Sequence, residues 1–84
     1  MENIQTLKEV AAYIEKGNFE HTLLKFQDAL YSLASYDSIG EEIVFDSPDN
    51  KTITILSSNR YEGGKIQTVL QETNGVLINQ YNSI

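Results

Sequence analysis

The spacing of the hydrophobic residues changes near residue 40 and divides the chain into two parts. Before that point, large apolar residues recur every three or four positions, which is typical of one face of a helix. After it, apolar and polar residues alternate, as on a half-buried strand. The pattern predicts two helices followed by four strands. The helices are expected at about 3–16 and 19–36, and the strands at about 41–46, 51–57, 65–73 and 76–82.

The first predicted helix has a continuous apolar stripe. It consists of Ile4, Leu7, Val10, Ala11 and Ile14. Thr6 and Glu9 have the spacing of a capping box, and Asn3 is an alternative cap, so the first residue of the helix stays open. Gly17 is suited to the left-handed residue that ends a helix, and Asn18 to the cap of the next helix.

The second predicted helix has a stripe at spacings of three and four residues. Its members are Phe19, Leu23, Phe26, Leu30 and Leu33. The stripe lasts about two heptads, whereas a coiled coil usually needs three or four. We therefore expect a helix that faces the core.

Two turn signals set the expected strand pairing. In "SPDN", Pro48 suits the first central position of a turn and Asn50 tolerates a left-handed conformation. A three-residue loop at 48–50 pairs Phe45 with Ile53 and Ile43 with Ile55. Asn74-Gly75 predicts a two-residue hairpin loop, with Glu72 opposite Leu77, Leu70 opposite Asn79 and Thr68 opposite Tyr81. The inner face of this second hairpin would be Ile66, Leu70, Leu77 and Tyr81.

The expected fold is a single α+β domain over residues 1–84, with two N-terminal helices packed on one face of a four-stranded antiparallel β-meander. In this arrangement several aliphatic side chains point away from the helices. They are Val44, Leu56, Val69, Val76 and Ile78. They are either scattered surface residues or a contact patch for a partner or a second subunit.

Charge is distributed unevenly along the chain. The net charge is −6, and residues 1–46 carry nine acids and three bases while residues 47–84 carry three of each. No Lys or Arg lies between Lys25 and Lys51. Direct nucleic-acid binding is not expected, because contacts to phosphates need clustered basic residues. With no long apolar run and an acidic N-terminus, we expect a cytoplasmic protein that does not span a membrane, whereas the lack of Cys leaves the redox compartment open.

Candidate catalytic and metal-binding residues are sparse. His21 is the only histidine and has no Cys beside it to complete a metal site or a nucleophilic triad. The acid-rich turn from Asp46 lacks the Gly and the final Glu of an EF-hand loop. Glu41 and Glu42 are adjacent in a predicted strand and so point to opposite faces. We expect no enzymatic activity, no metal and no cofactor.

Two segments, "FDSPDNKTITILSS" and "TVLQETNG", resemble the central strand, turn and final hairpin of the uracil-DNA glycosylase inhibitor family of Bacillus phages. The resemblance implies a small acidic inhibitor that imitates duplex DNA, with acids on an edge strand and the following helix and a pocket for an apolar side chain. Glu20 and Asp28, in "FEHTLLKFQDAL", are the acids that carry over. That segment is predicted as continuous helix and lacks the strand and the Pro-Glu-Glu of the family.

The resulting functional hypothesis is a phage-type inhibitor or anti-defence protein that binds a host nucleic-acid enzyme or defence nuclease by presenting negative charge as a DNA mimic. The expected partner-binding residues are Glu20, Asp28, Asp37, Glu41, Glu42, Asp46 and Asp49. Two alternatives use the apolar face instead: an immunity or antitoxin-like protein that binds a partner, and a homo-oligomeric accessory protein such as a homodimer.

Overall fold

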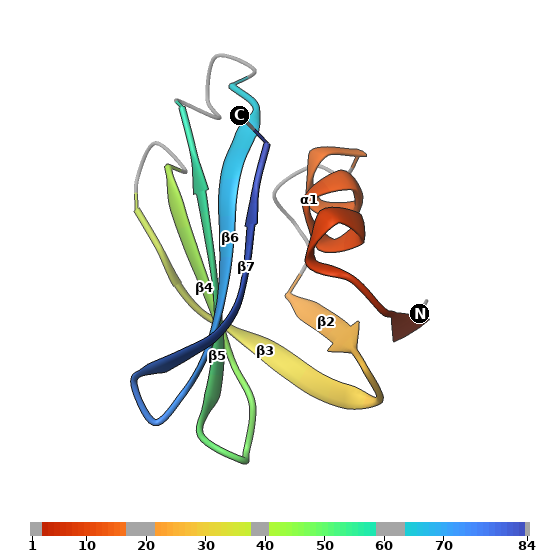
Figure 1. Cartoon of the computed structure of the whole chain (residues 1–84), viewed down its shortest axis with the longest axis vertical. Coiled ribbons are helices and arrows are strands. Elements are labelled where there is room, and N and C mark those ends of the chain that lie inside the picture. The colour runs from red at the N-terminus through yellow and green to blue at the C-terminus, as the bar shows by residue number, and fades with distance from the viewer. Residues whose placement is uncertain (1–2, 17–21, 38–40, 59–63, 84) are drawn as a thin grey trace.

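The computed structural model describes residues 3–16, 22–37, 41–58 and 64–83, and the fold is mostly β (Figure 1). Within these described residues, one helix and seven strands follow one another. They are β1 (Asn3–Ile4), α1 (Leu7–Lys16), β2 (Leu23–Phe26), β3 (Ala29–Tyr36), β4 (Glu42–Asp46), β5 (Lys51–Ser57), β6 (Ile66–Thr73) and β7 (Val76–Asn82). The strands lie side by side in sequence order. Strands β2 to β7 are antiparallel and curl into a half-barrel, and the short β1 pairs parallel with β2.

The helix α1 begins where the capping box predicts. The Glu9 backbone N–H donates to the Thr6 hydroxyl at 3.2 Å, and that hydroxyl donates to the Glu9 carboxylate at 2.8 Å. Asn3, the alternative cap, belongs to β1, so the helix is shorter at its start than the predicted 3–16. The apolar stripe from Ile4 to Ile14 is buried as expected. Gly17 and Asn18 lie outside the described residues.

The prediction of a second helix at 19–36, and with it the two-helix α+β fold, is wrong. Residues 23–26 and 29–36 form the strands β2 and β3. Gln27 and Asp28 between them have φ angles of 50° and 65°, which makes a tight turn with two left-handed residues. Phe26 is buried, whereas Leu30 is 48% exposed, so the predicted stripe does not lie on one face. Phe19 lies outside the described residues.

A long-range contact supports this turn, whose residues are not the Asn-Gly that such turns favour. The Asn3 side-chain amide donates to the Asp28 carboxylate at 2.7 Å, and the Asp28 backbone N–H donates to the Asn3 side-chain oxygen at 2.9 Å. The Gln27 backbone N–H donates to the Ile4 carbonyl at 2.8 Å. Thus β1 holds the β2–β3 turn, and the local sequence alone gives little sign of it.

The first of the two predicted hairpins is confirmed. Phe45 pairs with Ile53 and Ile43 with Ile55. Asn50 has the left-handed conformation expected of it, with φ 60°. The inward row of this hairpin is therefore the one that the alternation of the sequence predicts.

The second hairpin is confirmed only near its turn. Glu72 pairs with Leu77, and Asn74 and Gly75 have positive φ angles. A bulge between Gln71 and Glu72 then shifts the register by one residue. The pairs beyond it are Leu70 with Gln80 and Thr68 with Asn82, and not Leu70 with Asn79 and Thr68 with Tyr81.

The inner face of β6 and β7 also differs from the prediction. Val69 and Gln71 are buried, whereas Leu70 is half-buried and Leu77 is exposed. Gln71 is 6% exposed, and its side-chain amide donates to the Tyr31 hydroxyl at 3.3 Å. This contact joins β6 to β3 and satisfies the amide inside the half-barrel.

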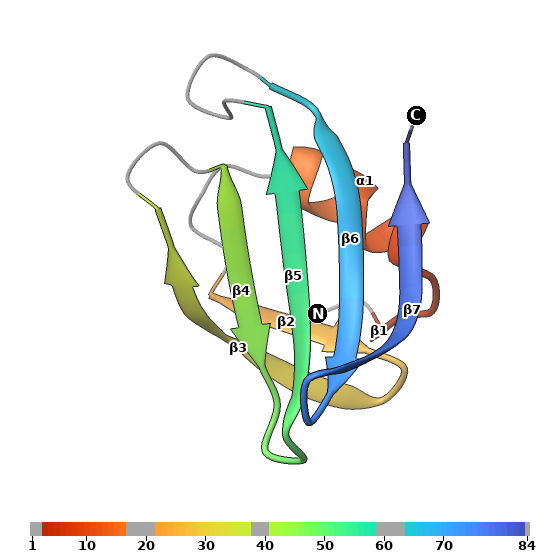
Figure 2. The same cartoon turned by 60° about the vertical axis from the view of Figure 1, so that its left-hand side comes forward.

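The helix α1 covers the concave side of the sheet, beside β6 and β7 (Figures 1 and 2). Part of its attachment is polar, because the Ile66 backbone N–H donates to the Glu15 carboxylate at 2.8 Å. Among the described residues, no helix is long and apolar enough to cross a membrane.

Removing this attachment should loosen α1. Glu15→Ala leaves the Ile66 N–H without its acceptor, and we expect a loss of about 1–2 kcal/mol in the free energy of unfolding. Glu15→Gln keeps an oxygen acceptor and should lose about half of that. Urea unfolding followed by circular dichroism measures both, and equal stability of Glu15→Ala and the parent would contradict the prediction.

Candidate protein-binding face

The convex side of the half-barrel is uncovered by α1 (Figure 2). Because Ile43, Phe45, Ile53 and Ile55 are buried inside, their neighbours on β4 and β5 point outward. We define the outer face as the outward residues of β4 to β7. It comprises Glu42, Val44, Asp46, Thr52, Thr54, Leu56, Thr68, Leu70, Glu72, Leu77, Gln80 and Asn82.

One row of side chains across the outer face contains acidic, hydroxyl and apolar groups. Strand pairing places Asp46 beside Thr52, Thr52 beside Glu72, and Glu72 beside Leu77. The Thr52 hydroxyl donates to the Asp46 carboxylate at 3.3 Å. Two strand spacings separate the backbones of Asp46 and Glu72, or roughly 10 Å, and four residues along β4 separate Glu42 from Asp46, or roughly 13 Å.

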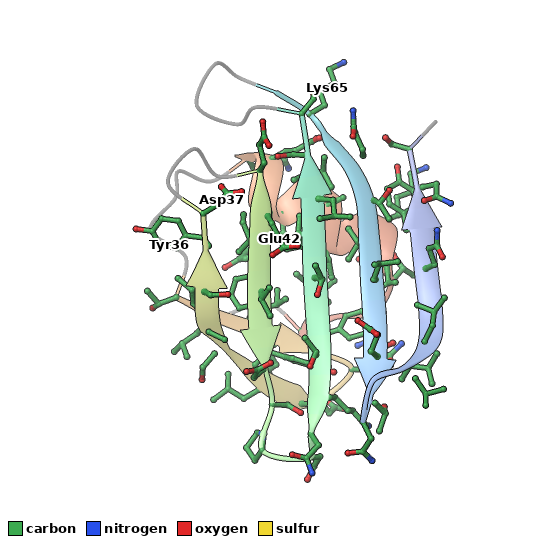
Figure 3. All side chains as sticks on the ribbon, turned by 90° about the vertical axis from the view of Figure 1, so that its left-hand side faces the viewer. Tyr36, Asp37, Glu42 and Lys65 are labelled. Carbon is green, nitrogen blue, oxygen red and sulfur yellow. The ribbon has the colours of Figure 1, made fainter. Side chains whose placement is uncertain are left out.

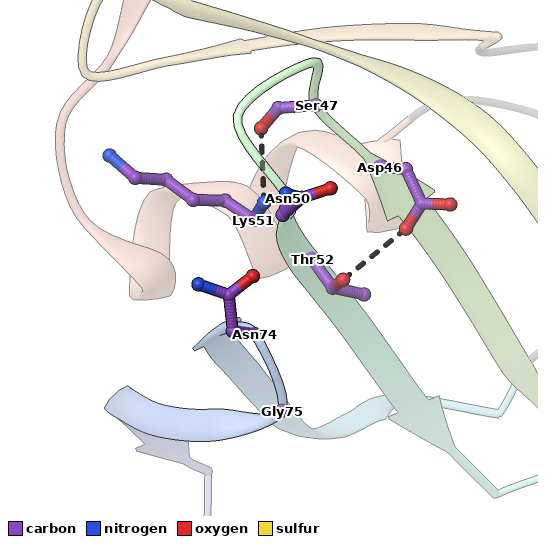
Figure 4. Close-up of a pocket in the computed structure, with 7 residues that line it drawn as sticks. All are labelled: Asp46, Ser47, Asn50, Lys51, Thr52, Asn74 and Gly75. Carbon is purple, nitrogen blue, oxygen red and sulfur yellow. Dashed lines mark hydrogen bonds between the residues drawn. The ribbon is translucent and has the colours of Figure 1, made fainter.

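All charged residues of the outer face are acids: Glu42, Asp46 and Glu72. The nearest base in sequence, Lys51, extends away from Asp46 and Thr52 in Figure 4. Lys65 lies at the start of β6, at the edge of the view in Figure 3. This face therefore attracts cations and the basic surfaces of proteins.

The predicted partner-binding acids divide between the two ends of β4. At one end, the Asp37 carboxylate accepts the backbone N–H groups of Glu41 at 2.7 Å and Glu42 at 3.2 Å (Figure 3). Asp37 thus joins the residue after β3 to the first residues of β4, and its carboxylate already accepts two hydrogen bonds. Asp46 ends β4 at the opposite end, and the exposed Asp49 follows in the next turn.

Of the two acids taken from the family resemblance, only Asp28 is described by the structure, and it does not join this face. Asp28 lies in the β2–β3 turn, bonded to Asn3. Glu20 lies outside the described residues, as does His21. The acidic stretch is therefore continuous in sequence but not on the surface.

The predicted apolar face is correct for Val44 and Leu56 and wrong for Val69, and Val76 and Ile78 flank the outward Leu77 and are not part of the outer face. Val44 and Leu56 are half-buried on the outer face, and Val76 and Ile78 are 65% and 53% exposed. Val69 is fully buried, because it pairs with the buried Ile55 and the bulge in the β5–β6 pairing puts it on the same face as Ile66.

Two residues of the row were missing from the sequence prediction, Glu72 and Leu77. The Asn74-Gly75 turn correctly places Glu72 opposite Leu77, but the neighbouring hairpin must be aligned before Glu72 falls beside Asp46. The Asn74 N–H donates to the Asn50 carbonyl at 3.1 Å and supplies that alignment. The sequence signal for placing Glu72 beside Asp46 was thus the pair of turns at 48–50 and 74–75, whose tips lie together.

A shallow pocket of about 380 Å³ opens between these two turns (Figure 4). It is lined by Asp46, Ser47, Asn50, Lys51, Thr52, Asn74 and Gly75. Within residues 3–16, 22–37, 41–58 and 64–83, no three acidic or histidine side chains are grouped to hold a metal ion. The pocket therefore adds amide, hydroxyl and ammonium groups to the end of the outer face.

No family model, curated protein or solved structure matches the chain. The capacity of the outer face follows from its own residues, which are three carboxylates, several hydroxyls and amides, and a few aliphatic side chains. Such a surface suits the binding of a basic protein surface.

Proposed function

We propose that the chain is a non-enzymatic inhibitor of the phage or anti-defence type that acts in the cytoplasm, where its outer face occupies the nucleic-acid-binding site of a host protein. The observation that carries the proposal is the uncovered sheet surface whose charged residues, Glu42, Asp46 and Glu72, are all acids.

Electrostatics explains why such a face selects this class of target. Nucleic-acid enzymes gather Lys and Arg along the path of the phosphates. The backbone positions of the outer-face acids are separated by roughly 10 and 13 Å, which is comparable to the ~12 Å width of the DNA major groove. Complementary charge speeds association and makes binding sensitive to salt.

The resemblance to the uracil-DNA glycosylase inhibitors bears on the choice of target. A strand at 23–26 removes one difference from that family, because this segment was expected to be helix. Another difference stays, since β3 takes the place of the helix that follows the acidic strand in the family. Uracil-DNA glycosylase is therefore a first target to assay, and defence nucleases are the second.

The second candidate function is an immunity or antitoxin-like protein that binds its partner through apolar contacts. The exposed Val76, Leu77 and Ile78 at the start of β7 favour it. Binding through these side chains would persist at high salt, because apolar contacts are not screened. Salt dependence therefore separates the two functions.

The test is an inhibition assay with purified bacterial uracil-DNA glycosylase and a panel of defence nucleases, followed by affinity measurement on any enzyme that is inhibited. We expect inhibition of at least one enzyme, and a loss of affinity of about tenfold or more when salt rises from ~50 to ~500 mM. Inhibition with an affinity that does not change with salt concentration would favour the alternative that binds through apolar contacts. Failure to inhibit any of these enzymes would contradict the proposed class of target.

A further inference from the structure

We propose that β7 pairs with β7 of a second copy of this chain, antiparallel and about a two-fold axis, to form a homodimer. The inference goes beyond the proposed function and does not depend on it. The partner proposed for the unpaired edge of the sheet is a second copy of the chain.

The first observation is the exposure of β7. It is the last strand in the sheet, and no other described strand pairs with its free edge. Every residue of β7 except Tyr81 is exposed, including Val76, Leu77 and Ile78 at 65%, 51% and 53%. Sheet edges are normally protected by charged side chains or Pro, and β7 contains neither.

The second observation is the charge around β7, which identifies a second copy as the occupant. Residues 73–84 contain no charged side chain, so all 12 acids and 6 bases precede them. Two chains of net charge −6 repel each other across most of their surfaces. A strand without charge is the place where two copies approach with least repulsion, whereas a basic partner would be drawn to the acids.

The hydrogen bonds between β6 and β7 show which backbone groups of β7 face its free edge. The Ser83 N–H donates to the Gln67 carbonyl, and Asn82 pairs with Thr68, so backbone groups of Gln80 and Asn82 turn to the free edge. The Gln80 N–H donates to the Asn79 side-chain oxygen at 3.0 Å. Pairing exchanges this local bond for one between chains, and we therefore expect a reversible dimer that depends on concentration.

In an antiparallel pair with its axis perpendicular to the sheet, the two outer faces point to the same side. The outer faces of the two chains then form one continuous sheet surface. The dimer would present six outer-face carboxylates on one side, three from each chain.

The test is sedimentation velocity of the full chain between roughly 1 and 500 µM, at low and high salt. We expect the fraction of dimer to rise with concentration and to rise further with salt, because salt screens the repulsion between the acidic chains. This salt response is opposite to that expected for the inhibited enzyme, so the two proposals can fail separately. A monomer throughout this range would overturn the dimer.

Matched variants locate the contact. Leu77→Lys should weaken association at least tenfold, and Ile78→Lys serves as a second variant at the same edge. Leu30→Lys is the control, since Leu30 is similarly exposed at 48% but lies on the interior strand β3. Equal dimerisation of Leu77→Lys and the parent, or equal loss in Leu30→Lys, would overturn the assignment.

Cross-linking then tests the antiparallel pairing, because the chain has no native Cys. Single substitutions to Cys at positions 77 to 82 should form intermolecular disulfides most readily where one residue lies opposite itself, with lower yield on both sides. Leu30→Cys should cross-link only by random collision. A uniform yield over 77 to 82 would exclude a defined β7 pairing.

Discussion

Replacing Phe26 with Ala should lower the free energy of unfolding by about 3–5 kcal/mol. Phe26 is fully buried, and its ring meets the edge of Tyr31 with centroids 6.4 Å apart at 64°. Small domains have total stabilities near the low end of roughly 5–15 kcal/mol, so this loss should leave a large part of the chain unfolded at 37 °C. Thermal and urea unfolding measured by circular dichroism would show it.

Leu30→Ala is the matched control for this substitution. Leu30 is half exposed on β3, and its truncation should change stability by only about 0.5 kcal/mol. In a helix over 19–36, Phe26 and Leu30 would share one buried face and lose comparable stability. Similar losses in the two variants would therefore contradict the β2–β3 hairpin.

Neutralising the acidic row should weaken the inhibited complex about 10- to 100-fold and flatten its dependence on salt. The double variant Asp46→Asn/Glu72→Gln removes two charges from the outer face while keeping side-chain size. Both positions lie on the same row, with Thr52 between them. Affinity measured against salt concentration for the inhibited enzyme provides the comparison.

The control changes the net charge by the same amount elsewhere. Gln5→Lys/Ala12→Lys adds two positive charges at exposed positions, one two residues before α1 and one on it, away from the outer face. If both double variants lose affinity equally, overall charge governs binding and the outer face has no special role. A full loss in the first variant alone supports the proposed face.

Local signals predicted most of the second half of the fold. Pro48, Asn50 and Asn74-Gly75 carry the chemistry of their turns, and the β4–β5 register followed from them. The bulge in the β5–β6 pairing, which leaves Gln67 as an extra residue on β6, has no comparable signal in the sequence. This one residue was enough to put Val69 on the buried face with Ile66 and Leu70 on the other face.

The first half of the chain was predicted wrongly because its apolar residues have both helical spacing and strand spacing. Leu23, Phe26, Leu30 and Leu33 have helical spacing, while Leu24 with Phe26 and Tyr31 with Leu33 have strand spacing. The choice between them depends on the Gln27–Asp28 turn, which Asn3 supports from 25 residues away. Single-sequence periodicity contains no information about such a contact.

The sequence predicted that the candidate site is acidic, but it did not predict which acids lie together. Acidity of the stretch around β4 was evident from composition, and Glu42 and Asp46 do lie on one face. The carboxylates of Asp28 and Asp37 instead accept hydrogen bonds within the chain, from the Asn3 side chain and from the backbone N–H groups of Glu41 and Glu42. Glu72 could be placed on the same row as Asp46 only once the order of the strands in the sheet was known.

The pairing of Asn3 with Asp28 also bears on the order in which the chain folds. The β4–β5 and β6–β7 hairpins close through neighbouring residues, and such short loops form quickly. The β2–β3 turn needs a segment that lies 25 residues earlier, and closing that longer loop has a larger entropic cost. We therefore expect β1 and the β2–β3 turn to be among the last parts of the sheet to reach their final positions.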